Sequence, residues 1–167
     1  MNLVIIRHGP AGDPEEWERK GLDDRLRPLT PEGRKEMQRV AAGLGTLVPR
    51  IGVLATSPLV RAAETAEIVA KECDSQTVSL ETLAPDRDPE EVVRWLREQP
   101  AEQTVALVGH EPHLSLLVGY LLTGTPRSFV DLKKGGACRL ELPDPLEPGE
   151  GCLEWLLAPR GLRLLGR

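Results

Sequence analysis

The stretch Leu3-Val4-Ile5-Ile6-Arg7-His8-Gly9 near the start of the chain decides the fold and the chemistry that we expect. Its four apolar residues predict a short buried β-strand, and this strand ends abruptly in an arginine, a histidine and a glycine. In open α/β sheets, ligands bind at the carboxyl ends of the strands. A guanidinium and an imidazole at such an end indicate a site for an anion.

A second segment, residues 51–65, repeats this design with an apolar strand, a sharp turn and the start of a helix. Ser57 is expected to cap that helix, and Pro58 suits its first position because proline lacks the amide hydrogen that would be orphaned there. Arg61 then falls in the opening helical turn. A cation there opposes the helix dipole, so Arg61 is expected to have an anionic partner.

The third such segment, residues 104–112, is an apolar strand followed by a glycine, a histidine and a proline that can begin a helix. If the sheet is parallel, its strand ends bring four side chains to one pocket: Arg7, His8, Arg61 and His110. Arginine forks bind phosphate oxygens in a bidentate manner, and this set has no carboxylate or thiolate group suited to a metal. We therefore expect a phosphate site that uses no metal and no cofactor.

Further motifs extend the pattern over most of the chain. They are Arg27-Pro28-Leu29-Thr30 with Gly33-Arg34, the stretch 55–66, Leu83-Ala84-Pro85 with Asp88-Pro89-Glu90-Glu91, and Lys134-Gly135 before a late strand. Together with the Arg-His-Gly (RHG) motif, Ser57-Pro58 with Arg61-Ala62, and Gly109-His110, they make the chain resemble the histidine phosphatase superfamily (phosphoglycerate mutase-like). Within that superfamily it resembles the short SixA-type phosphohistidine phosphatases.

The resemblance implies a phosphoglycerate mutase-like α/β fold, a three-layer α/β/α sandwich with a mostly parallel central sheet. It also implies that His8 attacks phosphorus and forms a phosphohistidine intermediate that water hydrolyses. The other ring nitrogen of His8 would then donate to a backbone carbonyl, which fixes the tautomer. Arg7 and Arg61 would hold the non-bridging oxygens, and His110, cationic beside a bound dianion, would add a donor. All of this is expected in a single histidine phosphatase domain, residues 1–167.

Two further residues, Gly9 and Arg27, are candidates for substrate binding. For Arg27 the resemblance suggests a contact to phosphate or substrate at the rim of the pocket, but a solvated loop arginine fits the sequence equally well. His113, the remaining histidine, is expected to pack or to support the site from behind.

The general acid is less determined by the sequence. An alkoxide leaving group needs a proton, and Glu81, at the end of a predicted strand 77–80, is slightly preferred to Glu111, which follows His110. In phosphohistidine the leaving group is an imidazole, whose conjugate acid has a pKa near ~6.5, so its expulsion demands much less of an acid. We therefore expect an enzyme, a protein phosphohistidine phosphatase of the SixA type.

Two alternatives stay open: a broad-specificity small-molecule phosphomonoesterase and a non-catalytic phosphoryl-binding module, which would leave His8 unexplained. Residues 10–17 lack the Thr and Asn that mutase-like relatives place there, so phosphoglycerate mutation is not expected. The expected partner is a phosphorylated protein, with a histidine-containing phosphotransfer domain as the family-level expectation, or a small phosphate ester.

Composition narrows the possible partners. The chain has 21 basic and 26 acidic residues and a formal charge of −5, which argues against nucleic acid. The absence of a signal peptide or a membrane-length apolar stretch predicts a cytoplasmic protein without a membrane partner. Cys73, Cys138 and Cys152 lack metal-like spacing and are expected to be reduced, buried thiols, although Cys138 and Cys152 could come close.

Periodicity and turn signals also predict the other elements. Residues 10–29 should form a loop over the site with one helical turn around Trp17, and residues 143–149 should form a turn. Helices are expected from Thr30-Pro31 through Leu47 and at 58–71, 89–98 and 112–122, and a late hairpin of 136–142 with 151–157 should add an antiparallel edge.

Overall fold

Six strands form one mixed sheet in the computed structural model, which describes residues 1–166. The order across the sheet is β3-β2-β4-β1-β5-β6. The first four of these strands are mutually parallel, and β5 and β6 continue the sheet in antiparallel fashion. Their bounds are β1 Asn2–Arg7, β2 Val53–Thr56, β3 Thr77–Ser79, β4 Thr104–Gly109, β5 Ala137–Glu141 and β6 Cys152–Leu157.

Strand β1 owes its place inside the sheet to its run of aliphatic residues. Leu3 and Ile5 pack into the hydrophobic core on one face, whereas Val4 and Ile6 pack into the core on the other face. Side chains alternate between the faces of a strand, so a strand with helices on both sides needs apolar residues at every position. The predicted buried strand is confirmed.

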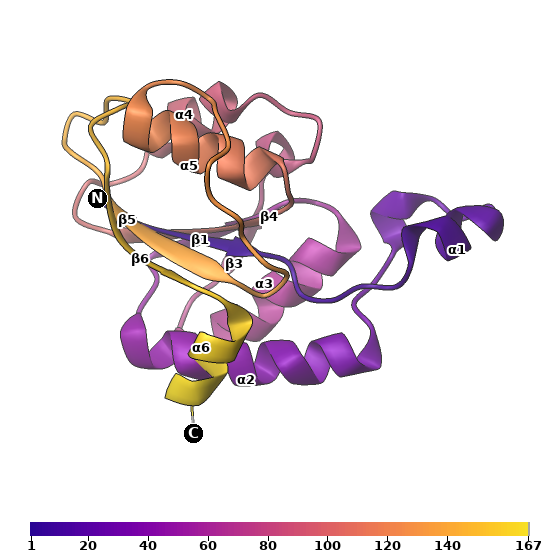
Figure 1. Cartoon of the computed structure of the whole chain (residues 1–167). Helices are drawn as coiled ribbons and strands as arrows, with labels where there is room; N and C mark the ends of the chain where they lie inside the picture. The colour runs from indigo at the N-terminus through magenta and orange to yellow at the C-terminus, as the bar shows by residue number, and fades with distance from the viewer. Residues whose placement is uncertain (167) are drawn as a thin grey trace.

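Helices cover both faces of the sheet and complete the three layers (Figure 1). Helices α4 (Pro89–Arg97) and α5 (His113–Thr123) pack on one face. Helices α2 (Pro31–Leu47), α3 (Val60–Glu72) and α6 (Pro159–Leu165) pack on the other. This arrangement confirms the predicted α/β/α sandwich with a mostly parallel sheet and an antiparallel edge.

Two helix starts differ from the sequence-based expectation. Helix α3 begins at Val60, not at Pro58, because the backbone of Leu59 is still extended, with φ −66° and ψ 134°. The N–H of Ser57 donates to the carbonyl of Val108 at 2.9 Å and so continues the β-ladder. The hydroxyl of Ser57 accepts from the N–H of Leu59 in the intervening turn and caps no helix. Helix α5 begins one residue later than expected, at His113.

Residues 10–29 project from the body of the molecule as an arm that ends in α1 (Figure 1). The arm contains α1 (Pro14–Arg19), which confirms the helical turn expected around Trp17, and a 3-10 helix, η1 (Asp24–Leu26). A bridge between Ala11 and Leu29 closes its base. The N–H of Leu29 donates to Glu64 of α3 at 2.8 Å, and this hydrogen bond holds the C-terminal end of the arm against the body.

The late hairpin confirms the predicted antiparallel edge but corrects the expectation for the cysteines. Cys73 and Cys138 are free and buried, whereas Cys152 is free and exposed because it opens the edge strand β6. Cys152 pairs with Glu141 in the β5–β6 ladder, at the opposite end of β5 from Cys138. Burial raises the pKa of the Cys138 thiol to about 12, which makes this thiol unreactive.

Helix α6, near the end of the chain, is an element that the sequence pattern did not predict. Helix α6 packs against α2, where Gly43 lies so close to the carbonyl of Leu162 that a Cβ at this position would be 1.8 Å from that oxygen. Helices in the described residues are all too short or too polar to cross a membrane.

Candidate active site

Backbone hydrogen bonds tie together the strand ends that carry the predicted site residues. The N–H of His8 donates to the carbonyl of Gly109 at 3.0 Å, which joins the end of β1 to the end of β4. The N–H of Arg7 donates to Gly136, and the N–H of Gly135 donates to the carbonyls of both Arg7 and His8. Because Gly135 has a φ of +76°, a glycine suits the backbone conformation that makes these two hydrogen bonds better than any other residue. The convergence expected for a parallel sheet is therefore present.

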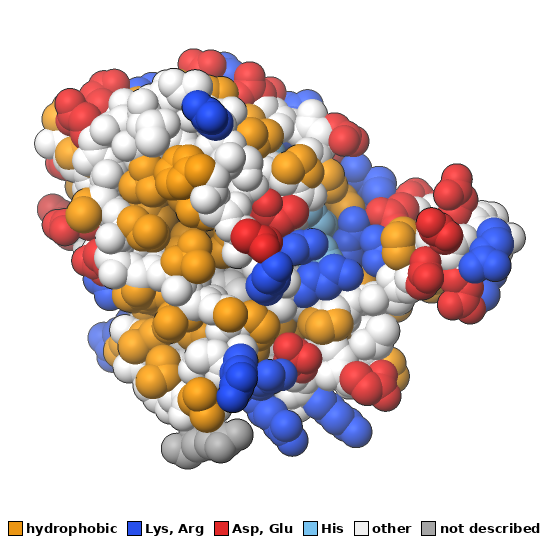
Figure 2. All heavy atoms as spheres, in the orientation of Figure 1, with side chains coloured by type: hydrophobic (Ala, Val, Ile, Leu, Met, Phe, Trp, Pro, Cys, Tyr) orange, Lys and Arg blue, Asp and Glu red, His pale blue; other side chains and the backbone are white. Residues whose placement is uncertain are grey.

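A cavity of about 550 Å³ lies at this edge, between the strand ends and the arm. Figure 2 shows a histidine side chain in the hollow beside the arm, with Lys and Arg side chains towards the arm and Asp and Glu side chains on the other side. The lining includes six of the eight candidate residues, and Gly9 and Glu81 are outside it. The lining residues are Arg7, His8, Pro14, Asp24, Arg25, Arg27, Leu59, Arg61, Ala84, Pro85, Asp86, His110, Glu111 and Lys134.

His8 is held in the orientation that a nucleophile requires. Its Nδ1 lies 2.7 Å from the carbonyl oxygen of Gly9, and because a carbonyl can only accept, Nδ1 carries the proton. In the neutral ring, Nε2 then has the lone pair. Burial, opposed by the Gly9 hydrogen bond and aided by the charges of Arg61, Arg7 and Lys134, lowers the pKa of His8 to about 4. The imidazole is therefore neutral at physiological pH.

Gly9 lies outside the cavity lining and helps to fix the orientation of His8. A Cβ at this position would lie 2.3 Å from Cγ of Met37, so the close approach of α2 requires glycine. The N–H of Gly9 donates to Oγ1 of Thr65 at 3.0 Å, and that hydroxyl donates to the carbonyl of Arg61. The loop after β1 is thus anchored to the helix that carries Arg61.

His110 faces His8, with 5.0 Å between the ring centroids. Its Nε2 lies 2.8 Å from the hydroxyl of Ser57, and its Nδ1 is buried without a hydrogen-bond partner in the part of the chain that the structure describes. Burial, with the charges of His8, Arg61 and His113, lowers the pKa of His110 to about 3. The sequence interpretation gave Ser57 as a helix cap and as part of the family motif, and the structure places its hydroxyl against His110.

The arginines are held by carbonyl oxygens and by one carboxylate. Arg7 donates through Nη1 to the carbonyl of Leu132 at 2.8 Å. Arg27, for which the sequence allowed a solvated position, is buried, lines the cavity and donates to the carbonyl of Gly12 and to the carboxylate of Asp24. Arg61 also donates to Asp24. No sequence pattern pointed to Asp24, because only the folding of the arm brings it to the arginines.

Burial opposes the ionisation of Asp24, but the hydrogen bond from Arg27 and the charges of Arg61 and Arg27 outweigh it and lower the pKa of this carboxyl. Asp24 is therefore anionic at neutral pH.

The two candidate acids lie in different places. Glu81 starts the 3-10 helix η2 (Glu81–Leu83); its side chain is 59% exposed, and its carboxylate lies 3.4 Å from Arg25. Glu111 lines the cavity, and its carboxyl accepts from the N–H and the hydroxyl of Ser115. Burial raises the pKa of Glu111, although the Ser115 hydrogen bonds and the charge of Arg7 oppose the shift. The structure brings Glu111, and not Glu81, to the cavity.

In the described residues, no group of three or more His, Cys, Asp and Glu side chains is placed to hold a metal ion. The cavity instead combines guanidiniums with two imidazoles, a set that suits a tetrahedral oxyanion.

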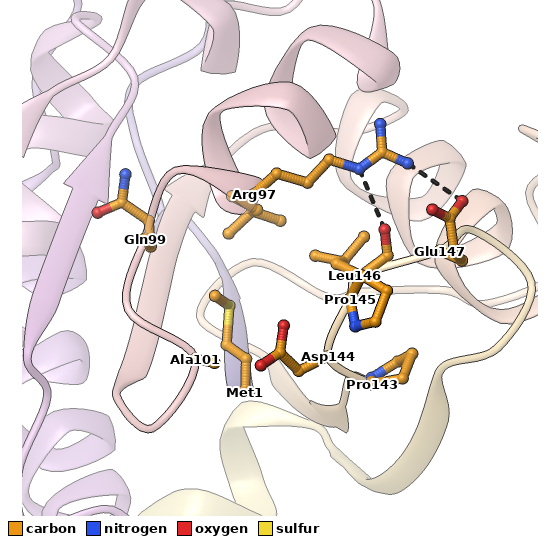
Figure 3. Close-up of a pocket in the computed structure, with 10 residues that line it drawn as sticks. Met1, Arg97, Gln99, Ala101, Pro143, Asp144, Pro145, Leu146 and Glu147 are labelled. Carbon is orange, nitrogen blue, oxygen red and sulfur yellow. Dashed lines mark hydrogen bonds and ion pairs between the residues drawn. The ribbon is translucent and has the colours of Figure 1, made fainter.

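A second cavity, of about 250 Å³, contains Met1, Gln99 and Asp144 among its ten lining residues and has a different character (Figure 3). Arg97 donates through Nε to the carbonyl of Leu146 at 3.0 Å and pairs through Nη2 with Glu147 at 3.3 Å. None of the ten lining residues is a histidine. The elements for phosphoryl chemistry therefore gather in the first cavity.

Comparisons with known proteins agree with this geometry. A model of the histidine phosphatase superfamily (branch 1) matches residues 3–84. The chain is 33% identical over 139 residues to an uncharacterized protein of Picosynechococcus sp., covering 81% of this chain and 82% of the relative. It is 27% identical over 169 residues to the phosphohistidine phosphatase SixA of Escherichia coli (strain K12), covering 98% of both. A solved structure of the protein histidine phosphatase SixA complexed with tungstate is similar, with a TM-score of 0.80, 28% identity and coverage of 97% of this chain and 99% of that chain.

Proposed function

The chain belongs to the histidine phosphatase superfamily, in its SixA-type branch, and from this premise we propose that it hydrolyses protein phosphohistidine through a covalent intermediate on His8. The observation that carries the proposal is the fixed tautomer of His8. Its Nδ1–H donates to Gly9 at 2.7 Å, which leaves the lone pair on Nε2 for attack.

In the first step, Nε2 of His8 forms a bond to phosphorus while the bond from phosphorus to the substrate nitrogen breaks. The imidazole of the substrate leaves with that electron pair and takes up a proton. In the second step, water attacks phosphorus, the bond to Nε2 breaks, and inorganic phosphate is released. Two easier displacements thus replace one difficult displacement.

The groups around His8 stabilise the charge of the transferring phosphoryl group. We assign Arg7 and Arg61 to its non-bridging oxygens, because both side chains line the cavity and both lie close enough to lower the pKa of His8. His110 supplies a further donor through Nδ1, whose hydrogen-bonding capacity is unused in the described structure. A bound dianion favours protonation of His110, whose pKa is otherwise lowered by burial. Arg27 contributes at the rim.

Glu111 is the carboxyl group best placed to protonate a leaving group, since it lines the cavity and burial raises its pKa. Its contribution matters for an alkoxide and little for an imidazole, whose conjugate acid has a pKa near ~6.5. The similarity to SixA proteins supports phosphohistidine, and not an alkyl phosphate, as the preferred substrate that we propose. The arginines and His110 provide the electrostatic stabilisation, so we also propose that catalysis needs no added metal.

We propose that one catalytic domain performs this chemistry on a phosphorylated cytoplasmic protein. The site lies in an open cavity at the edge of the sheet, which gives access to a histidine side chain on a partner's surface. A histidine-containing phosphotransfer domain is the kind of partner that such a site would accept.

The test is paired turnover of a phosphohistidine-bearing protein and a generic aryl phosphate, by wild type and by His8→Ala, with and without a chelator. Strong His8-dependent loss of phosphohistidine with slow ester cleavage supports the proposal. Rapid ester cleavage without a preference for phosphohistidine contradicts the substrate assignment. Loss of activity in the chelator would contradict metal independence.

A further inference from the structure

Asp24 occupies hydrogen-bond donors that a phosphoryl group needs. Its carboxylate accepts from Nε of Arg27 at 2.8 Å through one oxygen and from Nη2 of Arg61 at 3.1 Å through the other. Both arginines line the cavity and are almost fully buried. Two guanidiniums that share an anion in this way form the arrangement in which arginines bind the oxygens of phosphate.

The carboxylate is not the only group that orients these arginines. Nη1 of Arg61 donates to the backbone carbonyl of Asp24 at 2.9 Å, and Nη1 of Arg27 donates to the backbone carbonyl of Gly12 at 2.6 Å. Neither carbonyl contact involves the side chain of residue 24. The carboxylate therefore adds negative charge to an orientation that the backbone of the arm already provides.

The charge balance of the cavity makes this carboxylate consequential. Its lining contains five Lys and Arg side chains against three Asp and Glu side chains. Of these three carboxyl groups, Asp24 is the one that pairs with cavity arginines in the structure of residues 1–166. Its side chain is 54% exposed on the arm, so it can turn towards solvent when another anion takes its place.

We propose that Asp24 is an internal competitor for the phosphate site, whose carboxylate must leave Arg61 and Arg27 before a phosphoryl group binds them fully. The inference rests on the proposed function, because it requires that the cavity bind phosphate. In wild type, displacement of Asp24 weakens the binding of inorganic phosphate, the product, and so favours its release. A residue that merely positioned the arginines would have the opposite effect on affinity when removed.

Calorimetric titration of inorganic phosphate into wild type, Asp24→Asn and Asp24→Ala tests the sign of the effect. If Asp24 competes with phosphate, the Kd for phosphate should fall in both variants. We expect a fall of about three- to tenfold, because the charge pair is partly exposed. Asp24→Asn keeps the shape of the side chain. Asp24→Ala avoids placing an amide N–H against a guanidinium, and a thermal melt of each variant verifies that it is folded.

Asp23→Asn is the matched control. Asp23 is the adjacent carboxylate; it accepts from the N–H of Arg25 at 2.9 Å and is not among the residues that line the cavity. The same change of charge at Asp23 should leave the Kd for phosphate within about twofold of wild type, because an exposed charge outside the cavity is screened. A similar gain in affinity at both positions would mean that the change in net charge alone causes the effect, and it would overturn the proposal.

An unchanged or higher Kd in the Asp24 variants would also overturn it, and a higher Kd would identify Asp24 as a positioning residue. This failure is distinct from a failure of the proposed function. If wild type neither binds phosphate nor hydrolyses phosphohistidine through His8, the proposed function and the inference both fail. If wild type does both and the Asp24 variants bind phosphate no more tightly, only the inference fails.

Discussion

The cavity has two walls of different construction. The wall formed by the strand ends carries Arg7, His8 and His110. The backbones of Arg7 and His8 are held in the hydrogen-bond network of the sheet, and His110 directly follows β4. The opposite wall is the arm, which contributes Asp24, Arg25 and Arg27 from a short 3-10 helix and the residue after it. A bridge closes the base of the arm, and a few side-chain contacts join the arm to the body.

The difference separates two tasks of a phosphatase site. In the mechanism that we propose, the wall of strand ends places the reacting groups with little freedom, as a covalent mechanism requires. In the same proposal the arm brings charges that adjust how tightly the phosphoryl group is held, and its exposed side chains can change without disturbing the core. Substitutions in the two walls should therefore differ in both the size and the kind of their effects.

The largest effect is expected at His8. His8→Ala removes the nucleophile and should lower the turnover of phosphohistidine by roughly 10³-fold or more, as is usual when a covalent nucleophile is lost. Rapid quench with a radiolabelled substrate should trap an acid-labile phosphoenzyme in wild type and none in the variant. Labelling of the variant at wild-type levels would place the nucleophile elsewhere.

Arg61 and Arg27 allow a direct comparison of the body with the arm, since both are buried and both contact Asp24. Arg61→Lys should lower kcat/KM on the order of 10²-fold, because lysine cannot reproduce the fork that binds phosphate oxygens. Arg27→Lys should cost only about tenfold, because Arg61 and not Arg27 is close enough to affect the pKa of His8. Equal losses would show that the arm takes part in the chemical step as fully as the body.

Acid should lower the free energy of unfolding of the protein through two histidines in the wall of strand ends. Burial lowers the pKa of His8 to about 4 and that of His110 to about 3, whereas both are near 6.5 in the unfolded chain. As the pH falls from about 6.5 to about 4, the unfolded state binds protons that the folded state does not, so the free energy of unfolding falls by up to ~1.4 kcal/mol per pH unit for each imidazole.

Thermal or denaturant unfolding of wild type and His8→Gln across this pH range, without phosphate, measures the effect. The variant should lose stability less steeply than wild type, because one of the two buried imidazoles is gone. Parallel curves for the two proteins would mean that His8 does not contribute to the acid sensitivity.

Ser57 should have a moderate effect through His110. Ser57→Ala removes the hydroxyl 2.8 Å from Nε2 of His110 and should lower kcat about tenfold, the usual range for one buried hydrogen bond. Ser57→Thr, which retains a hydroxyl, should restore most of the rate. A loss confined to KM, or no rescue by threonine, would argue against a positioning role.

The smallest effect is expected at the exposed Arg25–Glu81 pair beside the arm. Glu81→Gln should leave the hydrolysis of phosphohistidine and of an aryl phosphate within about twofold of wild type, because exposed pairs contribute little. Glu111→Gln, the comparison inside the cavity, should reduce the cleavage of an alkyl phosphate more than that of phosphohistidine. A loss above tenfold for esters in Glu81→Gln would make Glu81 the acid.

Most of the wall of strand ends could be predicted from the sequence. Arg7, His8 and His110 follow apolar runs, and Arg61 follows a strand-turn-helix signal, so the rule that parallel strand ends meet at one edge was enough to bring them together. The N-cap of α2 at Thr30 and its apolar face were equally readable from local pattern. These features depend on residues near one another in sequence or on a general property of parallel sheets.

The contacts of the arm could not be predicted in this way. Asp24 meets Arg61 across 37 residues of sequence, and whether Arg27 is buried or solvated depends on how the arm folds back onto α3. Likewise, only the folded structure shows that Glu111 lines the cavity and that Glu81 lies outside it.

The sequence by itself determined the parallel sheet, the four strand-end groups and hence the phosphoryl chemistry, because hydrophobic periodicity and turn residues act locally. The tertiary structure alone decided which side chains complete the site: Ser57 behind His110, Glu111 at the cavity and Asp24 between two arginines. These pairings depend on the distances between elements after packing, and those distances follow from the whole core rather than from any one segment.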